Sequence, residues 1–583
     1  MPYTFIEKPY TFHIFYSRIR KILCDLYVNL VICFQKCVRL FIAYASTFEK
    51  KILIENSLNR KGKSRENGTL TAGTHTSCWF EQGLRSDNFP MLGSDMETDV
   101  VIVGGGLAGL TTAYCLVSSG KKVIVLEDGF IGSGETGRTT AQIVTALEDR
   151  YYQMEETFGR ENTSIIAESH KAAINFIEET VYKEKINCDF EKLNGYLFLH
   201  PSDKEENLKK EFDAMNRCGI SGTILENTPG IAIEKSCIHF PGQAQFQPIK
   251  YLLGLCEVIK KKSGQIFINT HVSKIDHTGV KTDTGFTVHA KHIVVATNAP
   301  VNDKYTMMLK QAAYRSYVIG ALIKKNTLIK ALWWDTGDCN SISGNPYHYA
   351  RLHSHSDEYD LLISGGEDHI VGKVDHLSGE ERYHRLEKWT RERFTIEDVI
   401  YKWSGEVLVT MDSIPYIGRN RFDKDNVYII TGDNGIGMTY CTIGGILISD
   451  LINGKKNKWE DIYKPSRFIA KKSESLFKIL KDDFVSVLKK WFYNKTGELE
   501  SVKPDEGKIV LINGHKCGAY RNPSGKLFLV SAECTHLKCM VVWNNDEKSW
   551  DCPCHGSRFT FTGKVINGPA NTNLPAYHEH AKN

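Results

Sequence analysis

Two short pairs of cysteine and histidine near the C-terminus have the residue types and the spacing of a metal centre. Cys534 and His536 are separated by one residue, and Cys552 and His555 follow after fifteen more. Thiolates and imidazoles bind iron-sulfur clusters and also zinc, so the ligand set alone leaves two kinds of site open. In a 2Fe-2S cluster of this mixed type, two thiolates bind one iron and two imidazoles bind the other.

A glycine-rich stretch far upstream has the residue types that bind a dinucleotide. It reads G-x-G-x-x-G and contains Gly104, Gly106, Leu107, Ala108 and Gly109. The first glycine permits a tight turn, the second lets the backbone approach a pyrophosphate, and the third lets a helix pack closely on a strand. Glu127 follows at the distance where a carboxylate accepts a hydrogen bond from an adenosine ribose. The stretch predicts a dinucleotide site, but it does not separate FAD from NAD.

Hydrophobic patterning predicts the elements that position both sites. Residues 99–104 predict a buried strand, residues 107–119 a helix and residues 122–127 a second strand, which places the glycines in a strand-to-helix turn. Residues 292–300 predict another buried strand. From 507 to 530, short apolar runs separated by Asn-Gly and Pro-Ser-Gly turns predict a small antiparallel β domain before the cysteine-histidine pairs.

Residues 412–452 add a strand, a glycine-rich turn and a second helix N-terminus. With this segment, the chain resembles the glycine oxidase and D-amino-acid oxidase family of FAD-dependent oxidoreductases, in which such a segment closes the flavin site. The resemblance implies FAD, an α/β Rossmann-like FAD-binding domain and an α+β substrate domain. It also implies cofactor contacts, which without the resemblance are ordinary turn residues, at Arg138, Thr139, Thr140, Val272, Gly435, Gly437, Met438 and Thr439.

The C-terminal unit resembles Rieske 2Fe-2S domains through its two ligand loops and through two glycine-containing stretches downstream, at 563–565 and 568–570. The resemblance implies a small all-β domain with a 2Fe-2S cluster on Cys534, His536, Cys552 and His555. In the Rieske subunits of respiratory cytochrome complexes, the cysteines that match Cys539 and Cys554 form a disulfide. The same bond is expected here, with two buried thiols as the alternative, and a zinc finger would not require either cysteine.

Two further positions bear on the potential of the cluster. Ser557 matches the hydroxyl that donates a hydrogen bond to a cluster sulfur in the cytochrome subunits. Phe559 stands where those subunits carry a tyrosine with a similar role. Because one donor is missing, we expect a potential below theirs and above that of Rieske ferredoxins that lack both hydroxyls.

Together the two resemblances predict the domain organisation. The predicted parts are an N-terminal extension, amphipathic or disordered, at 1–76; an FAD-dependent oxidoreductase at 77–468, with FAD-binding parts at about 97–150, 222–300 and 400–465 and substrate parts at about 151–221 and 301–399; a helical linker at 469–495; and the Rieske domain at 496–583. Residues 22–45 are apolar, but three charged residues interrupt the run, so we expect no membrane span there. Membrane contact through residues 20–48 would need an amphipathic helix at the surface.

Composition bears on which partners we expect for the protein and on its expected cellular compartment. With 73 Lys and Arg against 69 Asp and Glu, the net charge of +4 is small for 583 residues, which does not favour nucleic acid as a partner. Most of the sixteen cysteines are scattered singly, as in a reducing compartment, so a cytoplasmic location is expected, with membrane association as the alternative.

Joining the two predicted redox centres gives a hypothesis for function. A flavin accepts two electrons as a hydride and can release them singly, and a cluster carries one electron at a time. We expect the oxidation of a C–N bond in an amine or amino acid, with electrons passed to the cluster and then to an acceptor that the sequence does not identify. We name no catalytic base, and the candidates on the substrate side are Tyr314, Arg315, Tyr317 and Trp403. Arg315 could clamp a carboxylate with two hydrogen bonds, and a surface ion pair or a strand-end arginine is the alternative.

Other functional classes were weighed against this hypothesis. An electron-transfer or redox-sensing protein without a substrate of its own stays open, as does a reductase fed by NAD(P)H, although a second nucleotide fingerprint is missing. A Rieske ring-hydroxylating oxygenase would need an iron domain after the cluster, and only 28 residues follow His555.

Two polar stretches have no assigned chemistry. His348, His353, His355 and Asp357 resemble metal ligands in composition, but they fall near a predicted hairpin turn, where we expect solvated side chains. Residues 365–369 (GGEDH) are also polar and glycine-rich, and their chemistry is not predicted.

Overall fold

The computed structural model describes residues 75–83, 88–232, 235–302, 307, 310–338, 347–371, 377–420, 423–467 and 496–577. All of them belong to one compact unit, residues 66–583. The predicted apolar segment at 22–45 and the predicted linker at 469–495 lie outside the described residues. Within the described part of the chain, no helix combines the length and hydropathy that a membrane span needs.

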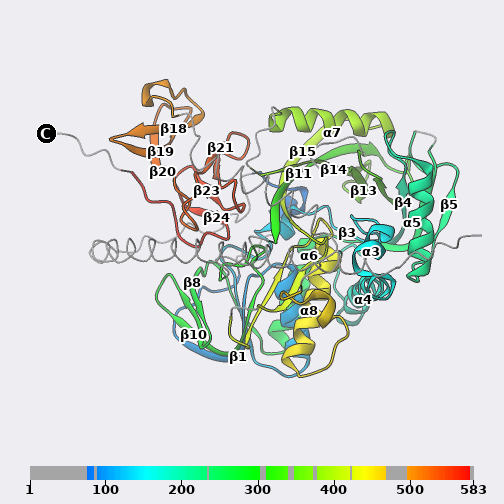
Figure 1. Cartoon of the computed structure of the whole chain (residues 1–583), viewed down its shortest axis with the longest axis horizontal. Coiled ribbons are helices and arrows are strands. Elements are labelled where there is room, and N and C mark those ends of the chain that lie inside the picture. Colours follow the sequence, from blue (N-terminus) through cyan, green and yellow to red (C-terminus); the bar gives the residue numbers. More distant parts are fainter. Residues whose placement is uncertain are drawn as a thin grey trace, which may run out of the picture. The chain divides into compact units, whose positions relative to one another are not determined.

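A mainly parallel sheet of eight strands forms the first layer (Figure 1). Its order is β16-β17-β10-β1-β2-β7, and β9 and β8 extend it beside β10. The bounds are β1 Met96–Val103, β2 Val123–Leu126, β7 Gln265–Phe267, β8 Val272–Asp276, β9 Gly279–Thr282, β10 Thr287–Val295, β16 Tyr416–Arg419 and β17 Val427–Thr431. The parallel strands β1, β2, β7, β10 and β17 are rich in Val and Ile and largely buried, as expected for a parallel sheet covered on both faces.

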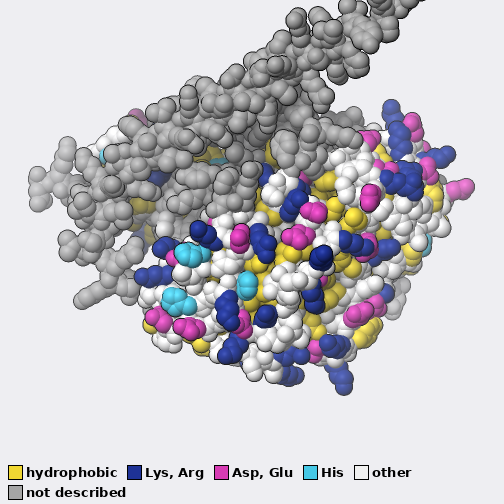
Figure 2. Space-filling model, turned by 60° about the horizontal axis from the view of Figure 1, so that its bottom comes forward, with side chains coloured by type: hydrophobic (Ala, Val, Ile, Leu, Met, Phe, Trp, Pro, Cys, Tyr) yellow, Lys and Arg dark blue, Asp and Glu magenta, His cyan; other side chains and the backbone are white. Residues whose placement is uncertain are grey.

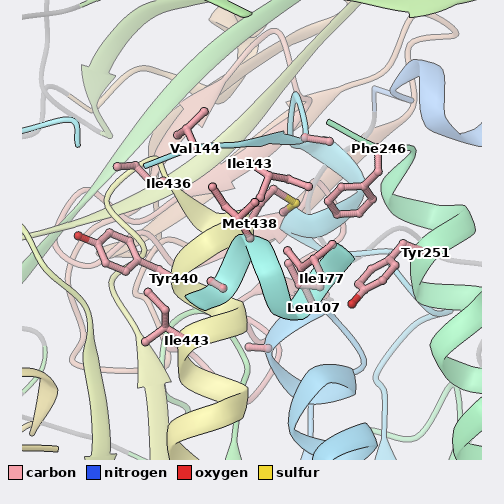
Figure 3. Packing of buried hydrophobic residues seen from close by; sticks show 14 of the residues in the cluster. Leu107, Ile143, Val144, Ile177, Phe246, Tyr251, Ile436, Met438, Tyr440 and Ile443 are labelled. Carbon is pink, nitrogen blue, oxygen red and sulfur yellow. The ribbon is translucent and has the colours of Figure 1, made fainter. Parts of the chain in front are cut away.

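Helices pack together around the N-termini of α2 and α8. The bounds are α2 Leu107–Ser118, α4 Arg160–Glu184, α6 Pro248–Lys261, α8 Gly437–Ile452 and α9 Glu460–Tyr463. In Figure 3, Leu107 and Met438 lie near one another in this core, and Phe246, Tyr251 and Ile177 pack beside them. The first turns of two helices are therefore fixed by apolar packing, which holds their N–H groups in place for a ligand.

A second sheet of nine strands is mainly antiparallel. Its order is β15-β11-β14-β13-β12-β4-β6-β3, with β5 beside β6. The bounds are β3 Gln142–Ile143, β4 Glu191–Phe198, β5 Thr223–Leu225, β6 Cys237–Gln245, β11 Gln311–Lys324, β12 Leu332–Asp335, β13 Tyr349–Ser354, β14 Tyr359–Ile370 and β15 Val399–Thr410. Helix α7 (Gly379–Arg393) packs against β11 and β14, as Figure 1 shows, and α5 (Glu205–Arg217) contacts α3 (Tyr151–Phe158) and β6.

The C-terminal part consists of two small antiparallel sheets. One contains β18 Glu506–Ile512, β19 His515–Arg521 and β20 Leu527–Ser531, and the other contains β21 Val542–Asn544, β22 Ser549–Asp551, β23 Arg558–Thr560 and β24 Val565–Asn567. The Asn513-Gly514 turn between β18 and β19 has two positive φ angles, 49° and 79°, as the predicted two-residue hairpin requires. Short 3-10 helices lie at η2 Cys78–Gly83, η3 Glu135–Arg138 and η6 Leu499–Ser501. The predicted fold class is confirmed in both parts.

Charged side chains are distributed without a patch of one sign on the described part of the face in Figure 2. Lys and Arg lie next to Asp and Glu across this face, in agreement with the small net charge. Such a surface gives no electrostatic reason to expect a polyanionic partner on that face.

Candidate active site and cluster site

The carboxyl ends of three parallel strands meet at one edge of the first sheet. Val103 of β1 pairs in register with both Leu126 of β2 and Val295 of β10, so the residues that follow these strands are neighbours. Gly104 has a φ of 110°, and a Cβ there would lie 2.3 Å from the carbonyl oxygen of Ala296. Only glycine fits this close approach, which is the role that the sequence predicts for it.

The turn leads into the N-terminus of α2. Gly106 is the N-cap, and the N–H of Leu107, the first of the helix, donates to Thr136 Oγ1 at 3.1 Å. The partial positive charge of the helix N-terminus favours an anionic ligand there. At Gly109, a Cβ would lie 2.0 Å from the carbonyl oxygen of Gly104, which shows that the third glycine is needed for packing. The backbone N–H of Gly105 donates to Glu127 Oε2 at 2.6 Å, so this carboxylate also supports the turn.

A cavity of about 250 Å³ extends from this turn. All but two of the predicted cofactor contacts line it, namely Gly104, Gly106, Leu107, Ala108, Glu127, Arg138, Thr139, Thr140, Val272, Gly435, Gly437 and Met438. Gly109 serves packing, and Thr439 is fully buried with its hydroxyl donating to the carbonyl oxygen of Ile436 at 3.2 Å. A helix N-terminus at the cavity, a glycine cradle and a buried acid fit a dinucleotide such as FAD.

The two cysteine-histidine loops also come together. Cys534 and Cys552 are fully buried, and the rings of His536 and His555 lie edge to face with centroids 5.3 Å apart. Nδ1 of His555 is buried and has no hydrogen-bond partner within the described chain, as expected of a nitrogen reserved for a metal. A disulfide between Cys539 and Cys554 joins the two loops. The donor set therefore fits a 2Fe-2S cluster.

Near the ligand loops, Ser557 and Phe559 are both fully buried. The Ser557 hydroxyl oxygen accepts a hydrogen bond from the backbone N–H of Ala570 at 2.9 Å and lies within hydrogen-bonding reach of Cys534. Its own proton is available to a sulfur acceptor.

Comparison with known proteins agrees with both sites. Residues 99–451 match the family described as FAD dependent oxidoreductase. The chain belongs to this family of FAD-dependent oxidoreductases. Residues 492–578 of the oxidoreductase match the Rieske [2Fe-2S] domain, so the enzyme carries both FAD and a 2Fe-2S cluster.

One relative of the oxidoreductase aligns with most of the chain, and others align with about two thirds of it. YhfW of Bacillus subtilis (strain 168), named as a Rieske 2Fe-2S iron-sulfur protein, is 32% identical over 83% of this chain and 94% of its own. The γ-glutamylputrescine oxidoreductase of Escherichia coli (strain K12) is 25% identical over 66% of this chain and 91% of its own. The structure of glycine oxidase from Geobacillus kaustophilus shares the fold, with a TM-score of 0.53 and 18% identity over 64% of this chain and all of that one.

Two further cavities of the oxidoreductase lie beside the cofactor cavity. A small cavity of about 60 Å³ shares Thr140, Gly435 and Met438 with the cofactor cavity, and it shares Glu148 and Tyr347 with a further cavity of about 330 Å³. We call the cavities of about 60 Å³ and about 330 Å³ together the acidic cavity. Its acids are Glu148, Asp149, Asp203, Glu211 and Asp368, its base is Arg150, and its aromatic residues are Tyr152, Tyr314, Trp334, Tyr347 and Tyr349.

Because these acids are buried near one another, it is unfavourable for all of them to be ionised at once. It raises the pKa of Asp368 to about 6 and that of Glu211 to about 7. The pKa of Glu148 is raised well above its usual range, first by burial and then by the charges of Asp368, Asp149 and Asp433. A positively charged ligand would relieve this repulsion.

The sequence alone did not identify the acidic cavity. Its acids come from the loop before α3, from α5 and from β14, so no local spacing unites them. The one available signal was the stretch at 365–369, which contributes Asp368. Gly365 is required there because a Cβ would lie 2.3 Å from the ring of Tyr349.

The histidine-rich stretch differs from the prediction. His348 is buried and lies between Asp335, at 3.3 Å, and Glu367, at 3.2 Å, and it stacks on Trp389. The expectation of a solvated side chain is therefore wrong for His348, whose role is structural, because the hairpin begins only after it. Asp357, at the tip of the hairpin, is exposed as expected.

Of the four substrate-side candidates, Tyr314 lines the acidic cavity. Arg315 is 2% exposed and donates to the Ser404 hydroxyl at 3.0 Å. The ring of Tyr317 stacks on His369, and Trp403 donates to the carbonyl oxygen of Arg138 at 2.8 Å. These three side chains make protein contacts that hold the second sheet in place.

Arg138 connects the flavin part with the Rieske domain. It lines the cofactor cavity, and its guanidinium bonds to the carbonyl oxygen of Ser404 and lies 3.4 Å from Glu547 Oε1. Glu547 also accepts from the Ser404 hydroxyl at 2.7 Å. Although burial alone would raise it, Arg138 holds the pKa of Glu547 well below its usual range. The contact between the two domains therefore contains a buried ion pair.

Proposed function

We propose that this oxidoreductase oxidises a C–N bond of an amine or amino acid and passes the electrons to its Rieske cluster. The observation that carries the proposal is the acidic cavity, which opens beside Gly435 and Met438 in the predicted flavin-contact loop. A hollow beside the cofactor cavity supports a small-molecule substrate rather than a protein that only relays electrons.

The lining favours substrates with positive charge. Five acids and one arginine surround the acidic cavity, and rings such as Tyr347 and Trp334 present faces that attract cations. Arg315, the candidate clamp for a carboxylate, lines neither the acidic cavity nor the cofactor cavity. We therefore place amines with more than one charge ahead of zwitterionic amino acids. The similarity to γ-glutamylputrescine oxidoreductase, whose name describes an amine substrate, also favours amines over amino acids as substrates.

The residues of the cavity also suit the proton balance of the reaction. FAD held by the cofactor cavity would supply a hydride acceptor for the carbon next to nitrogen, and this chemistry requires a neutral amine. Ionised Asp368, with a pKa raised to about 6, is available to take the ammonium proton. Glu148 and Tyr347 orient the nitrogen beside the glycine-rich loop. The scattered unpaired cysteines fit a cytoplasmic location, which we keep as part of the proposal.

The test is anaerobic reduction by a panel of diamines, monoamines, amino acids and NADH, followed by flavin absorbance. We expect amines to bleach the flavin and NADH to leave it unchanged. Asp368→Asn should raise the amine concentration for half-maximal rate about tenfold, since one attractive charge is lost. Asp357→Asn, the same change at the exposed tip of the same hairpin, should match the parent. Bleaching by NADH with no response to any amine would overturn the proposal.

A further inference from the structure

The Rieske domain supplies part of the wall of the cofactor cavity. We call residues 565–571 the wall segment; it begins with β24 and lies 10 residues beyond the ligand His555. The wall segment lines the same cavity as the β1–α2 turn and the acids at the end of β2, through Val565, Ile566, Asn567, Gly568, Ala570 and Asn571. Two domains that are distant in sequence therefore enclose one cofactor site.

Hydrogen bonds fix the wall segment at both ends. Asn571 Nδ2 donates to the carbonyl oxygen of Ser273 at 3.0 Å, and His271 Nε2 donates to the carbonyl oxygen of Asn571 at 3.1 Å. At the other end, Asn567 Nδ2 donates to Glu406 Oε1 at 3.0 Å. His271 also pairs with Asp128, at 3.2 Å, which lines the cavity next to the predicted ribose contact Glu127.

The wall segment packs closely on the flavin part, and one of its buried polar atoms has no hydrogen-bond partner in the described parts of the chain. A Cβ on Gly568 would lie 3.3 Å from the side chain of Val301, so the wall segment already touches the flavin part. Oδ1 of Asn571 is buried without a hydrogen-bond partner in the described parts of the chain. A buried acceptor without a partner is costly, and a donor group of a bound cofactor would satisfy it.

Further contacts also hold the Rieske domain against the flavin part. Glu547 is 1% exposed and contacts Arg138 and the Ser404 hydroxyl, as described above. A Cβ on Gly556, next to His555, would lie 2.7 Å from the side chain of Ala313 in β11. The ion pair and this contact hold the wall segment against the cavity; Arg138 belongs to the cavity lining, whereas Glu547, Gly556 and Ala313 do not.

We propose that the wall segment is part of the FAD site, so that FAD stays bound only while the Rieske domain is docked. Release of FAD then requires the wall segment to move, and the bound cofactor in turn holds the two domains together. Such linkage is reciprocal, because whatever stabilises the docked state must tighten FAD binding by the same factor. The proposal concerns cofactor retention and does not depend on which substrate is oxidised.

The first test places a charge on the wall segment. Asn571→Asp keeps the shape of the side chain and adds a negative charge to the cavity that receives the pyrophosphate. After dilution of the full-length enzyme, free FAD is followed by its fluorescence. We expect release about tenfold faster than in the parent. The control is Asn573→Asp, an exposed neighbour whose oxygen accepts from the Val565 N–H at 2.9 Å and still does so as a carboxylate.

The second test weakens docking at Glu547, a residue that does not itself line the cavity. Glu547→Gln removes the charge that pairs with Arg138, and it should speed FAD release while the electron paramagnetic signal of the reduced cluster shows that the Rieske domain is folded. The control is Glu533→Gln, the same change at an exposed position of that domain. Release from Asn571→Asp or Glu547→Gln within about twofold of the parent would overturn the proposal. All measurements are made without substrate, so their outcome is separate from that of the proposed reaction.

Discussion

Phe559 is the residue through which the potential of the cluster can be tested. It is fully buried two positions after Ser557, where a tyrosine would supply a second hydrogen bond to the cluster. Phe559→Tyr should raise the reduction potential by about 60 mV, which for one electron corresponds to about 1.4 kcal/mol of preference for the reduced state. A redox titration followed by electron paramagnetic resonance measures the shift. Phe561→Tyr is the control, and a Phe559→Tyr potential no higher than that of the parent would refute the role of position 559.

His348 tests a structural ion network. Burial alone would lower its pKa, but hydrogen bonds to Asp335 and Glu367 raise it to about 9. Because the pKa is higher in the folded than in the unfolded chain, its stabilising contribution is full below about pH 6.5 and is lost as pH rises through about 9.

His348→Gln should therefore lower the Tm by about 5 °C at pH 6.5, and by less at pH 9.5. Calorimetry at both pH values measures the difference. Exposed His277 provides the control as His277→Gln. Equal losses at the two pH values would show that the charge of His348 contributes nothing.

Single residues with a fixed local spacing were the most predictable part of the molecule. The cysteine-histidine pairs and the glycines of the β1–α2 turn each lie within a few positions of their partners, so sequence pattern and site geometry coincide. Arg315, Tyr317 and Trp403 could not be placed in this way, because their surroundings depend on how β11 pairs with β15. The roles of the predicted cofactor contacts stay predictions until a bound structure tests them.

Among the elements, the edge of the second sheet and the loops around α3 and α5 create the acidic cavity. Asp368 and Glu211, whose pKa values burial raises to about 6 and about 7, therefore ionise between pH 5.5 and 7.5. The cavity therefore becomes more negative as pH rises from 5.5 to 7.5.

A quaternary diammonium competitor has a charge that does not change with pH, so its inhibition constant reports the charge of the cavity. We expect this constant to fall about tenfold between pH 5.5 and 7.5, and to fall less in Asp368→Asn. A constant that is flat or that rises with pH would exclude cation binding at these acids.

Elements were predictable where periodicity is strong, and less so where neighbours decide their surroundings. The predicted strand, helix and strand from 99 to 127 agree with β1, α2 and β2 within a few residues, because each is a continuous apolar or helical pattern. The acids of the cavity come from separate elements, and Asp368 lies where the register between β14 and β11 shifts, a position that local sequence does not reveal.

At the scale of the whole molecule, the junction of the flavin part and the Rieske domain is the least visible from sequence. Arg138 and Glu547 are 409 residues apart, and neither stands in a recognisable motif for the other. Their contact, the wall segment and the packing of Gly556 on Ala313 place the ligand loop of the cluster directly on the flavin part. This contact supports the proposal that electrons pass from the flavin to the cluster within one chain.

The most direct test of this account is rapid mixing of the enzyme with a reducing amine under anaerobic conditions. Flavin absorbance and the electron paramagnetic signal of the Rieske cluster are followed in the same reaction at two protein concentrations. The account predicts that the flavin bleaches first, that the signal of the reduced cluster follows, and that its rate does not depend on protein concentration. A bleached flavin beside a cluster that stays oxidised, or a rate that doubles with the concentration of protein, would contradict it.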